Sequence, residues 1–296
     1  MPVTTSSLRK TPYVVGNMFS SNSVAGILPL PPAPVVGALP AGPTTYRHEH
    51  TIYPTLSGRL NHTVVPATSA DKRAVIRGPA LAAAGDTIFL KYYDNHITSI
   101  LLPLPVAGGP TFFVTDNLTG CRFFVDQIAA GGSGLIVYHA NTHGHSAGPL
   151  ADCDVQTANA SAELVLMHQN AQADYAALGF TLNNVATCTK HNYYLEAGHA
   201  ERRKRLQGRT EGNVFNNPAV GAAFAGGTTV VGFPVGPTWQ FWYQTYGTVD
   251  YKRPDIAIAN ALKAGQFNYL IKKARFGLDH DATFDKFEVI DCQQIW

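Results

Sequence analysis

The segment Thr111–His145 reads TFFVTDNLTGCRFFVDQIAAGGSGLIVYHANTHGH and gives the strongest indication of the fold. Apolar and β-branched residues gather in three short runs, namely Thr111–Val114, Arg122–Gln127 and Gly134–His139. A polar turn with Asp116 and Asn117 separates the first two runs, and a Gly-Gly-Ser-Gly turn separates the last two. The pattern predicts three consecutive β-strands, of which the last two form an antiparallel hairpin.

Similar runs continue on both sides of this segment. Upstream they recur at a spacing of about ten residues, at Ala74–Ile76, Thr87–Tyr93 and Ile97–Leu102. Downstream, the aromatic-rich stretch Thr228–Tyr246 and the tail Thr283–Ile290 are also typical of strands. Short strands separated by regular turns predict consecutive antiparallel strands in one sheet or in a sandwich.

Two segments have helical character instead. Residues 160–178 are expected to form a helix, with Asn159 or Ser161 as its N-cap and Gly179 as its stop. Its apolar residues fall on one face at helical spacing: Leu164, Met167, Ala171, Tyr175 and Leu178. A second helix is expected over 254–264, where Pro254 suits the first turn. The expected fold is therefore α+β, with a central, mostly antiparallel β-sheet or sandwich flanked by helices.

Composition divides the chain into two regions. Residues 1–45 are expected to form a Pro-rich N-terminal arm, because Leu28–Pro43 holds six prolines, which fix φ and remove hydrogen-bond donors. Residues 46–296 are expected to form a single catalytic α+β domain. A chain of 296 residues buries a core without disulfides or a metal. We expect the protein to be a monomer.

Charge and composition exclude several classes of function. Charged residues make up 14% of the chain and the net charge is only +2, which argues against a nucleic-acid-binding protein. No run of about 18 apolar residues occurs, so no membrane span is expected.

The cysteines and the N-terminus indicate a compartment. The four cysteines form no CxxC motif, and a chain of this length needs no disulfide framework, so reduced thiols and a cytosolic place of action are expected. The first residues lack the charged start and apolar run of a cleavable signal peptide. If the protein is secreted, it leaves its cell without such a signal.

Cys121 and His139 are the candidate catalytic residues. Cys121 begins one strand of the predicted hairpin and His139 ends the next, so both should lie at the same edge of the sheet. A neighbouring imidazole accepts the thiol proton, and the thiolate then attacks an amide carbon. His139 would protonate the departing ammonia and later activate water. This chemistry needs neither a cofactor nor a metal, and none is expected.

Four further residues are expected to form the oxyanion site or the pocket: Asn117, Thr119, Gly120 and Asn141. Gly120 leaves room for a substrate carbonyl beside backbone N–H groups, among them that of Cys121. A third group should orient the imidazole, either a backbone carbonyl or an Asp or Asn side chain.

The turn Leu118-Thr119-Gly120-Cys121, followed by a strand, a loop and His139, resembles the deamidase toxins of the cytotoxic necrotizing factor type and is similar to Burkholderia lethal factor. Those proteins carry a Ser- or Thr-Gly-Cys turn, with the base histidine on the following strand, over a sheet shielded by helices. The resemblance covers roughly residues 85–145.

The resemblance implies a thiol-dependent hydrolase that converts a glutamine of a host protein, such as a small GTPase or a translation factor, to glutamate. It assigns Cys121 as the nucleophile and His139 as the base, and it implies an orienting backbone carbonyl within Thr87–Asn95. Transglutamination is the expected side reaction. Such a protein would be a bacterial effector or toxin, a virulence factor that is secreted without a cleavable signal and acts in the target-cell cytosol.

Other functions stay open at this point. A papain-like cysteine protease or amidase would pair Cys121 with His168 or His191. A non-enzymatic binding or adhesion module would expose an aromatic platform formed by Trp239, Trp242, Tyr243 and Tyr246. A metal site would combine His139, His143 and His145 with Asp152 and Asp154, but the spacing does not match a zinc pattern.

Overall fold

A computed structural model gives the structure of the chain. The described residues are 2–18, 28–29, 49–53, 59–68, 72–78, 82, 84–93, 96–118, 121–141, 150–189, 192–193, 225–252 and 283–296. Among these, the backbone alone is described at 17, 28–29, 49, 150–162, 225–226, 248–252 and 283–286. The predicted helix over 254–264 lies outside the described residues.

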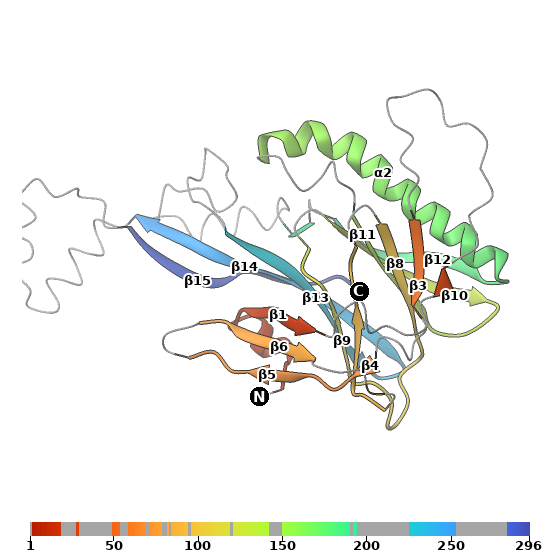
Figure 1. Ribbon diagram of the computed structural model, residues 1–296, viewed down its shortest axis with the longest axis horizontal. Helices are drawn as coiled ribbons and strands as arrows, with labels where there is room; N and C mark the ends of the chain where they lie inside the picture. The colour runs from red at the N-terminus through yellow and green to blue at the C-terminus, as the bar shows by residue number, and fades with distance from the viewer. Residues whose placement is uncertain are drawn as a thin grey trace, which may run out of the picture.

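The described chain is mostly β-sheet (Figure 1). The first sheet has the strand order β12-β10-β11-β8-β3-β2, formed by Thr181–Cys188, Arg122–Ala130, Leu135–Ala140, His96–Leu102, Glu49–Tyr53 and Leu28–Pro29. The second sheet has the order β15-β14-β13-β9-β7-β4, formed by Thr283–Gln294, Thr238–Lys252, Ala225–Val235, Phe112–Thr115, Thr87–Leu90 and Arg59–Leu60. A third, small sheet has the order β1-β6-β5, formed by Tyr13–Met18, Ala74–Gly78 and Thr63–Val65.

The pairing is mixed but mostly antiparallel. Three of the described pairs are parallel: β1 with β6, β3 with β8, and β7 with β9. The expectation that successive strands are antiparallel neighbours is wrong for β7, β8 and β9, because the chain crosses between the sheets at each step. β7 and β9 therefore lie side by side in the second sheet, while β8 belongs to the first. Both faces of these strands are buried, so their sequences show no alternation that would assign them to a sheet.

The first and second sheets pack face to face around one core. Phe113 of β9 contacts Phe123 of β10 with ring centroids 5.9 Å apart, and Phe123 contacts Phe241 of β14 at 5.6 Å. Gly232 of β13 makes room for this packing, since a Cβ there would lie 2.8 Å from the Phe241 ring. The apolar runs predicted as strands thus form the inner layers of a sandwich.

One long helix, α2 (Leu150–Ala177), lies across the outer face of the first sheet (Figure 1). Leu164, Met167, Ala171 and Tyr175 are buried in a second core, which they share with residues of β10 and β11, so the predicted apolar face is confirmed for these four. Leu178 is 57% exposed and does not belong to that face.

The predicted end of α2 is correct, but its predicted start is not. The helix begins at Leu150, so the expected N-cap at Asn159 or Ser161 is wrong. Its end agrees with the expected stop, because Gly179 follows with φ of 91°, a left-handed conformation that favours glycine. The other described helix is the single turn α1 (Thr5–Leu8). No helix in the described part of the chain has the length and apolar character needed to cross a bilayer.

The N-terminal residues up to Met18 pack against the second sheet. The buried side chain of Gln244 on β14 accepts a hydrogen bond from the Tyr13 N–H at 2.7 Å. Its amide group donates to the carbonyl of Thr11 at 2.8 Å and to that of Leu8. This part of the predicted arm is therefore integrated into the fold, and the division of the chain at residue 45 stays a prediction.

Candidate functional site

The β10–β11 hairpin brings the predicted catalytic residues to one face of the first sheet. The register pairs Phe123 with His139 and Arg122 with Ala140, which places Cys121 opposite Asn141. Directly opposed residues of antiparallel strands point to the same side, and those two positions away are diagonal neighbours. Cys121 and His139 are such diagonal neighbours on the inner face of the sandwich. The predicted hairpin, and the same edge for both residues, are confirmed.

Hydrogen bonds hold Cys121 at both its sulfur and its carbonyl. The Asn141 side-chain amide donates to Cys121 Sγ at 3.1 Å, and the Tyr193 hydroxyl donates to the Cys121 carbonyl at 2.8 Å. The Asn141 backbone N–H in turn donates to the His96 carbonyl at 2.9 Å. The sulfur therefore lies against a fixed donor, which stabilises a thiolate more than a thiol.

His139 is a neutral, buried imidazole. Its exposed fraction is 1%, and neither ring nitrogen has a hydrogen-bond partner. Burial lowers the pKa of His139 from 6.5 to about 3, so the ring is uncharged at neutral pH. The ring of Tyr92 stacks on it with centroids 5.5 Å apart and an interplanar angle of 29°. An uncharged imidazole is the form that accepts a proton from a thiol.

The remaining predicted pocket residues fall into two groups. Asn141 lies at the sulfur, as described above. Asn117 instead contacts the second sheet, where its side-chain oxygen accepts hydrogen bonds from Thr229 at 3.0 Å and Tyr246 at 2.6 Å. Thr119 and Gly120 lie outside the described residues, as do His143 and His145 of the metal alternative.

The predicted orienting carbonyl does not contact the imidazole nitrogens in this structure, since both nitrogens lack partners. The segment expected to supply it does pass beside His139. The Thr98 hydroxyl, on the strand next to His139, donates to the Lys91 carbonyl at 2.6 Å and to the His139 carbonyl at 3.3 Å. This hydroxyl ties the backbone before Tyr92 to the backbone of His139.

His168 lies on the opposite face of the first sheet from Cys121. It projects from α2, donates to the Asp126 carboxylate at 2.9 Å, and stacks on Phe124 with centroids 4.0 Å apart. Phe124 and Asp126 alternate with Phe123 along β10, so the sheet separates His168 from the thiol. The structure therefore does not bring together the papain-like pair with His168. His191 lies outside the described residues.

The aromatic platform of the binding-module alternative is not a surface. Trp239, Trp242, Tyr243 and Tyr246 are buried, with exposed fractions between 1% and 8%. Trp239 and Tyr243 have internal hydrogen-bond partners, the carbonyl of Pro103 at 2.9 Å and the carboxylate of Asp291 at 2.6 Å. These residues are core residues of the second sheet.

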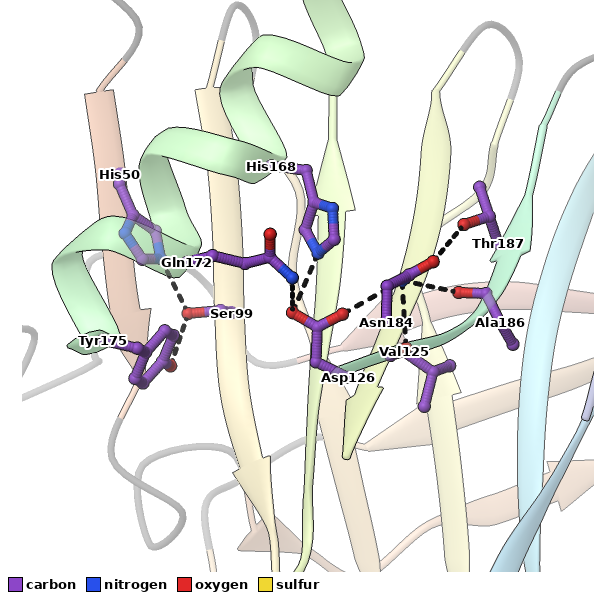
Figure 2. Close-up of polar contacts among 10 residues, drawn as sticks. All are labelled: His50, Ser99, Val125, Asp126, His168, Gln172, Tyr175, Asn184, Ala186 and Thr187. Carbon is purple, nitrogen blue, oxygen red and sulfur yellow. Dashed lines mark hydrogen bonds and ion pairs between the residues drawn. The ribbon is translucent and has the colours of Figure 1, made fainter. Parts of the chain in front are cut away.

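Figure 2 shows a buried polar network between α2 and the first sheet, centred on Asp126. The Asp126 carboxylate contacts His168 and Gln172 of α2 at 2.9 Å each, and it accepts from Asn184 of β12 at 3.0 Å. These partners hold the pKa of Asp126 below its usual range although burial acts in the opposite direction. The sequence analysis missed this network, because its members come from three distant segments.

A second network under α2 has the connectivity of a serine hydrolase triad. His50 contacts Ser99 Oγ through Nε2 at 2.9 Å and Asp174 through Nδ1 at 2.7 Å. Ser99 is completely buried within β8, and its hydroxyl also bonds to Tyr175 at 2.7 Å (Figure 2). Two of its members, Asp174 and Tyr175, come from α2, and the Ser99 hydroxyl is shared between His50 and Tyr175, so we assign this network to the attachment of α2.

Within the described residues, no group of three or more His, Cys, Asp or Glu side chains is arranged to hold a metal ion. Comparisons with known proteins add no relative: no protein-family model, no curated protein and no solved structure matches the chain. The candidate site therefore rests on the geometry of Cys121, His139 and Asn141.

Proposed function

We propose that the protein is a cysteine-dependent glutamine deamidase that acts on a protein substrate. One observation carries this proposal: Asn141 donates to the sulfur of Cys121 while a neutral His139 lies diagonally across the same hairpin, on the same face. A thiol, a proton acceptor and a donor aimed at the sulfur are the parts that a thiol amidase needs.

The reaction follows from these three side chains. In the resting site no hydrogen bond joins the Cys121 sulfur to either His139 nitrogen, so the transfer of the thiol proton to His139 follows opening of the site. The thiolate then attacks the side-chain carbonyl carbon of a glutamine. The tetrahedral oxyanion collapses as the C–N bond breaks, and His139 gives its proton to the leaving nitrogen, which departs as ammonia. Water, deprotonated by His139, then attacks the thioester. The C–S bond breaks, the thiol is regenerated and the product is glutamate.

Asn141 has two roles in this scheme. Its amide stabilises the thiolate before attack, because a hydrogen bond to a charged acceptor is stronger than one to a neutral acceptor. Once the sulfur is bonded to carbon, we assign the same N–H group to the oxyanion, together with the backbone N–H of Cys121. An amine that replaces water in the second half would give transglutamination.

Access to the pair requires movement. Cys121 is 2% exposed and His139 is 1% exposed, so a glutamine side chain reaches them only after the chain around them opens. Such opening fits a protein substrate, whose large contact surface supplies binding free energy that a free amino acid lacks. We accordingly propose a protein target over a small amide.

The biological setting is part of the proposal and rests on the turn before Cys121. We propose a bacterial effector or toxin, secreted without a cleavable signal, that modifies a host protein such as a small GTPase or a translation factor in the target-cell cytosol. The described cysteines Cys121, Cys188 and Cys292 are thiols and not disulfides, which agrees with action in a reducing compartment.

The test is intact-mass and peptide analysis of host-cell proteins after exposure to the full chain. A gain of about 1 Da at a glutamine that is absent with Cys121→Ser supports the proposal. His139→Ala should abolish the same change, whereas His168→Ala should leave it in place, provided that circular dichroism shows each variant folded. Full activity of folded Cys121→Ser would remove the mechanism.

A further inference from the structure

We propose that Tyr92 is the positioning residue of His139, and that the face of its phenol ring stabilises the imidazolium that forms when Cys121 loses its proton. This inference deepens the proposed function and rests on it. It adds a residue that the sequence pattern does not mark, since Tyr92 lies in the stretch between β7 and β8 among other aromatic residues.

The geometry is that of a stacked pair. The rings of Tyr92 and His139 are 5.5 Å apart at their centroids and inclined by 29°. A cation over an aromatic face within about 6 Å is attracted by the ring quadrupole, and the attraction grows where water is excluded. His139 is 1% exposed, so an imidazolium there has almost no water to stabilise it.

The peptide group that precedes the Tyr92 Cα is fixed at both its N–H and its carbonyl. Its N–H donates to the Asp116 carboxylate at 3.1 Å, and the preceding carbonyl, that of Lys91, accepts from Thr98 at 2.6 Å. The same Thr98 hydroxyl also reaches the His139 carbonyl at 3.3 Å. The backbone segments that carry the two rings thus share a hydrogen-bond donor, and their relative position does not depend on packing alone.

An imidazolium at His139 needs stabilisation that the hydrogen bonds of the resting site do not supply. Burial disfavours the charged form of His139, and neither ring nitrogen has an acceptor that would offset this cost. Ionisable groups on the surrounding segments include Lys91 and Tyr93 after β7, His96 on β8, Asp116 after β9, Cys121 just before β10 and Cys188 on β12. Of the described ring contacts of His139, the one with Tyr92 offers a π face to the imidazolium.

The experiment measures the alkylation rate of Cys121 by iodoacetamide against pH, with the site identified by peptide mass spectrometry. Rates are taken where they are proportional to iodoacetamide concentration, so that chemistry and not opening limits them. Tyr92→Leu and Tyr92→Met should lower the rate at pH 7 by about 3- to 30-fold, whereas Tyr92→Phe should stay within about 2-fold of the parent. In deamidation assays, the same variants should lower kcat and leave KM unchanged.

Two controls separate this role from a purely structural one. Tyr93→Leu removes the neighbouring ring, which stacks on Tyr53 and not on His139, and it should behave as the parent. In a His139→Ala background, Tyr92→Leu should have no further effect, because no imidazolium forms. Parent-like alkylation of Tyr92→Leu, or an equal loss in both backgrounds, overturns the inference. If His139→Ala leaves alkylation of Cys121 unchanged, the proposed function itself fails, which is a different result.

Discussion

Asn141 lies directly opposite Cys121 across the β10–β11 hairpin, and its side-chain amide donates to the sulfur at 3.1 Å. The contact joins the residue just before β10 to the residue just after β11, so both lie at the open end of the hairpin. It makes the sulfur part of a polar site although most of its surroundings are apolar core.

Replacing Asn141 should therefore affect the thiolate more than the fold. Asn141→Ala should lower kcat/KM by about 10- to 100-fold, since hydrogen bonds to charged groups contribute about 1.5–3 kcal/mol. Asn141→Asp should cost more, because a carboxylate repels the thiolate. Asn183→Ala removes an exposed amide from β12 and serves as the matched control, expected to retain activity. Unchanged kcat/KM in both Asn141 variants would contradict the assigned role.

His139 should make stability depend on pH in a defined window. Its pKa in the folded protein is about 3 and its ordinary value is 6.5, so between these values the unfolded chain binds more protons. The stabilising contribution is complete above pH 6.5 and is lost as the pH falls toward 3. We expect the free energy of unfolding in urea to drop by about 2 kcal/mol between pH 7 and pH 4.5 on account of this group.

The variant His139→Leu isolates that contribution. It cannot titrate, so its free energy of unfolding should change less over the same interval. It also removes two buried ring nitrogens without partners, and it should be at least as stable as the parent at pH 7 while inactive. The Asp126 carboxyl, whose pKa lies below its ordinary value of 3.8, acts only at lower pH, so it does not obscure the comparison. An identical pH dependence in the parent and the variant would show that His139 is not the titrating group.

The network around Asp126 should be a main support of α2. Asp126→Ala leaves His168, Gln172 and Asn184 without their shared acceptor, and loss of one member of a buried pair costs about 3–5 kcal/mol. The matched control is Asp86→Ala, which breaks a His–Asp contact with His62 at 3.3 Å, where the Asp86 side chain is 45% exposed. That change should cost only about 1 kcal/mol or less. Equal losses in chemical denaturation would contradict the assignment.

Gln244 should hold the N-terminal residues to the second sheet. In Gln244→Leu the backbone groups of Leu8, Thr11 and Tyr13 lose their partners, and each unsatisfied buried group costs about 1–3 kcal/mol. Hydrogen exchange in residues 2–18 should accelerate more than in β10 and β11. Gln240→Ala, which removes an acceptor for the Trp242 indole at 3.1 Å, is the control and should leave residues 2–18 protected. Unchanged exchange in Gln244→Leu would show that packing alone retains the segment.

The sequence alone determined the strands within 111–140 and their hairpin, whereas no predicted run covers β1, β3, β5 or β12. The runs around 111–145 become β9, β10 and β11, because apolar β-branched and aromatic residues between turn residues have few other stable conformations. The shared edge of Cys121 and His139 followed from that hairpin, since strand length and turn position set the register locally. The buried face of α2 was likewise predicted from the helical spacing of its apolar residues.

Only the tertiary structure decided which strands belong to which sheet, which face of the first sheet each histidine lies on, and which side chains complete the site. Tyr92, Tyr193 and Thr98 reach Cys121 or His139 from segments whose spacing along the chain carries no periodic signal. Asp126 and His168 are 42 residues apart and meet only because α2 folds back across the sheet. The local pattern of apolar and turn residues determines where strands and turns form. Contacts between distant segments depend instead on how the sheets and the helix pack as layers.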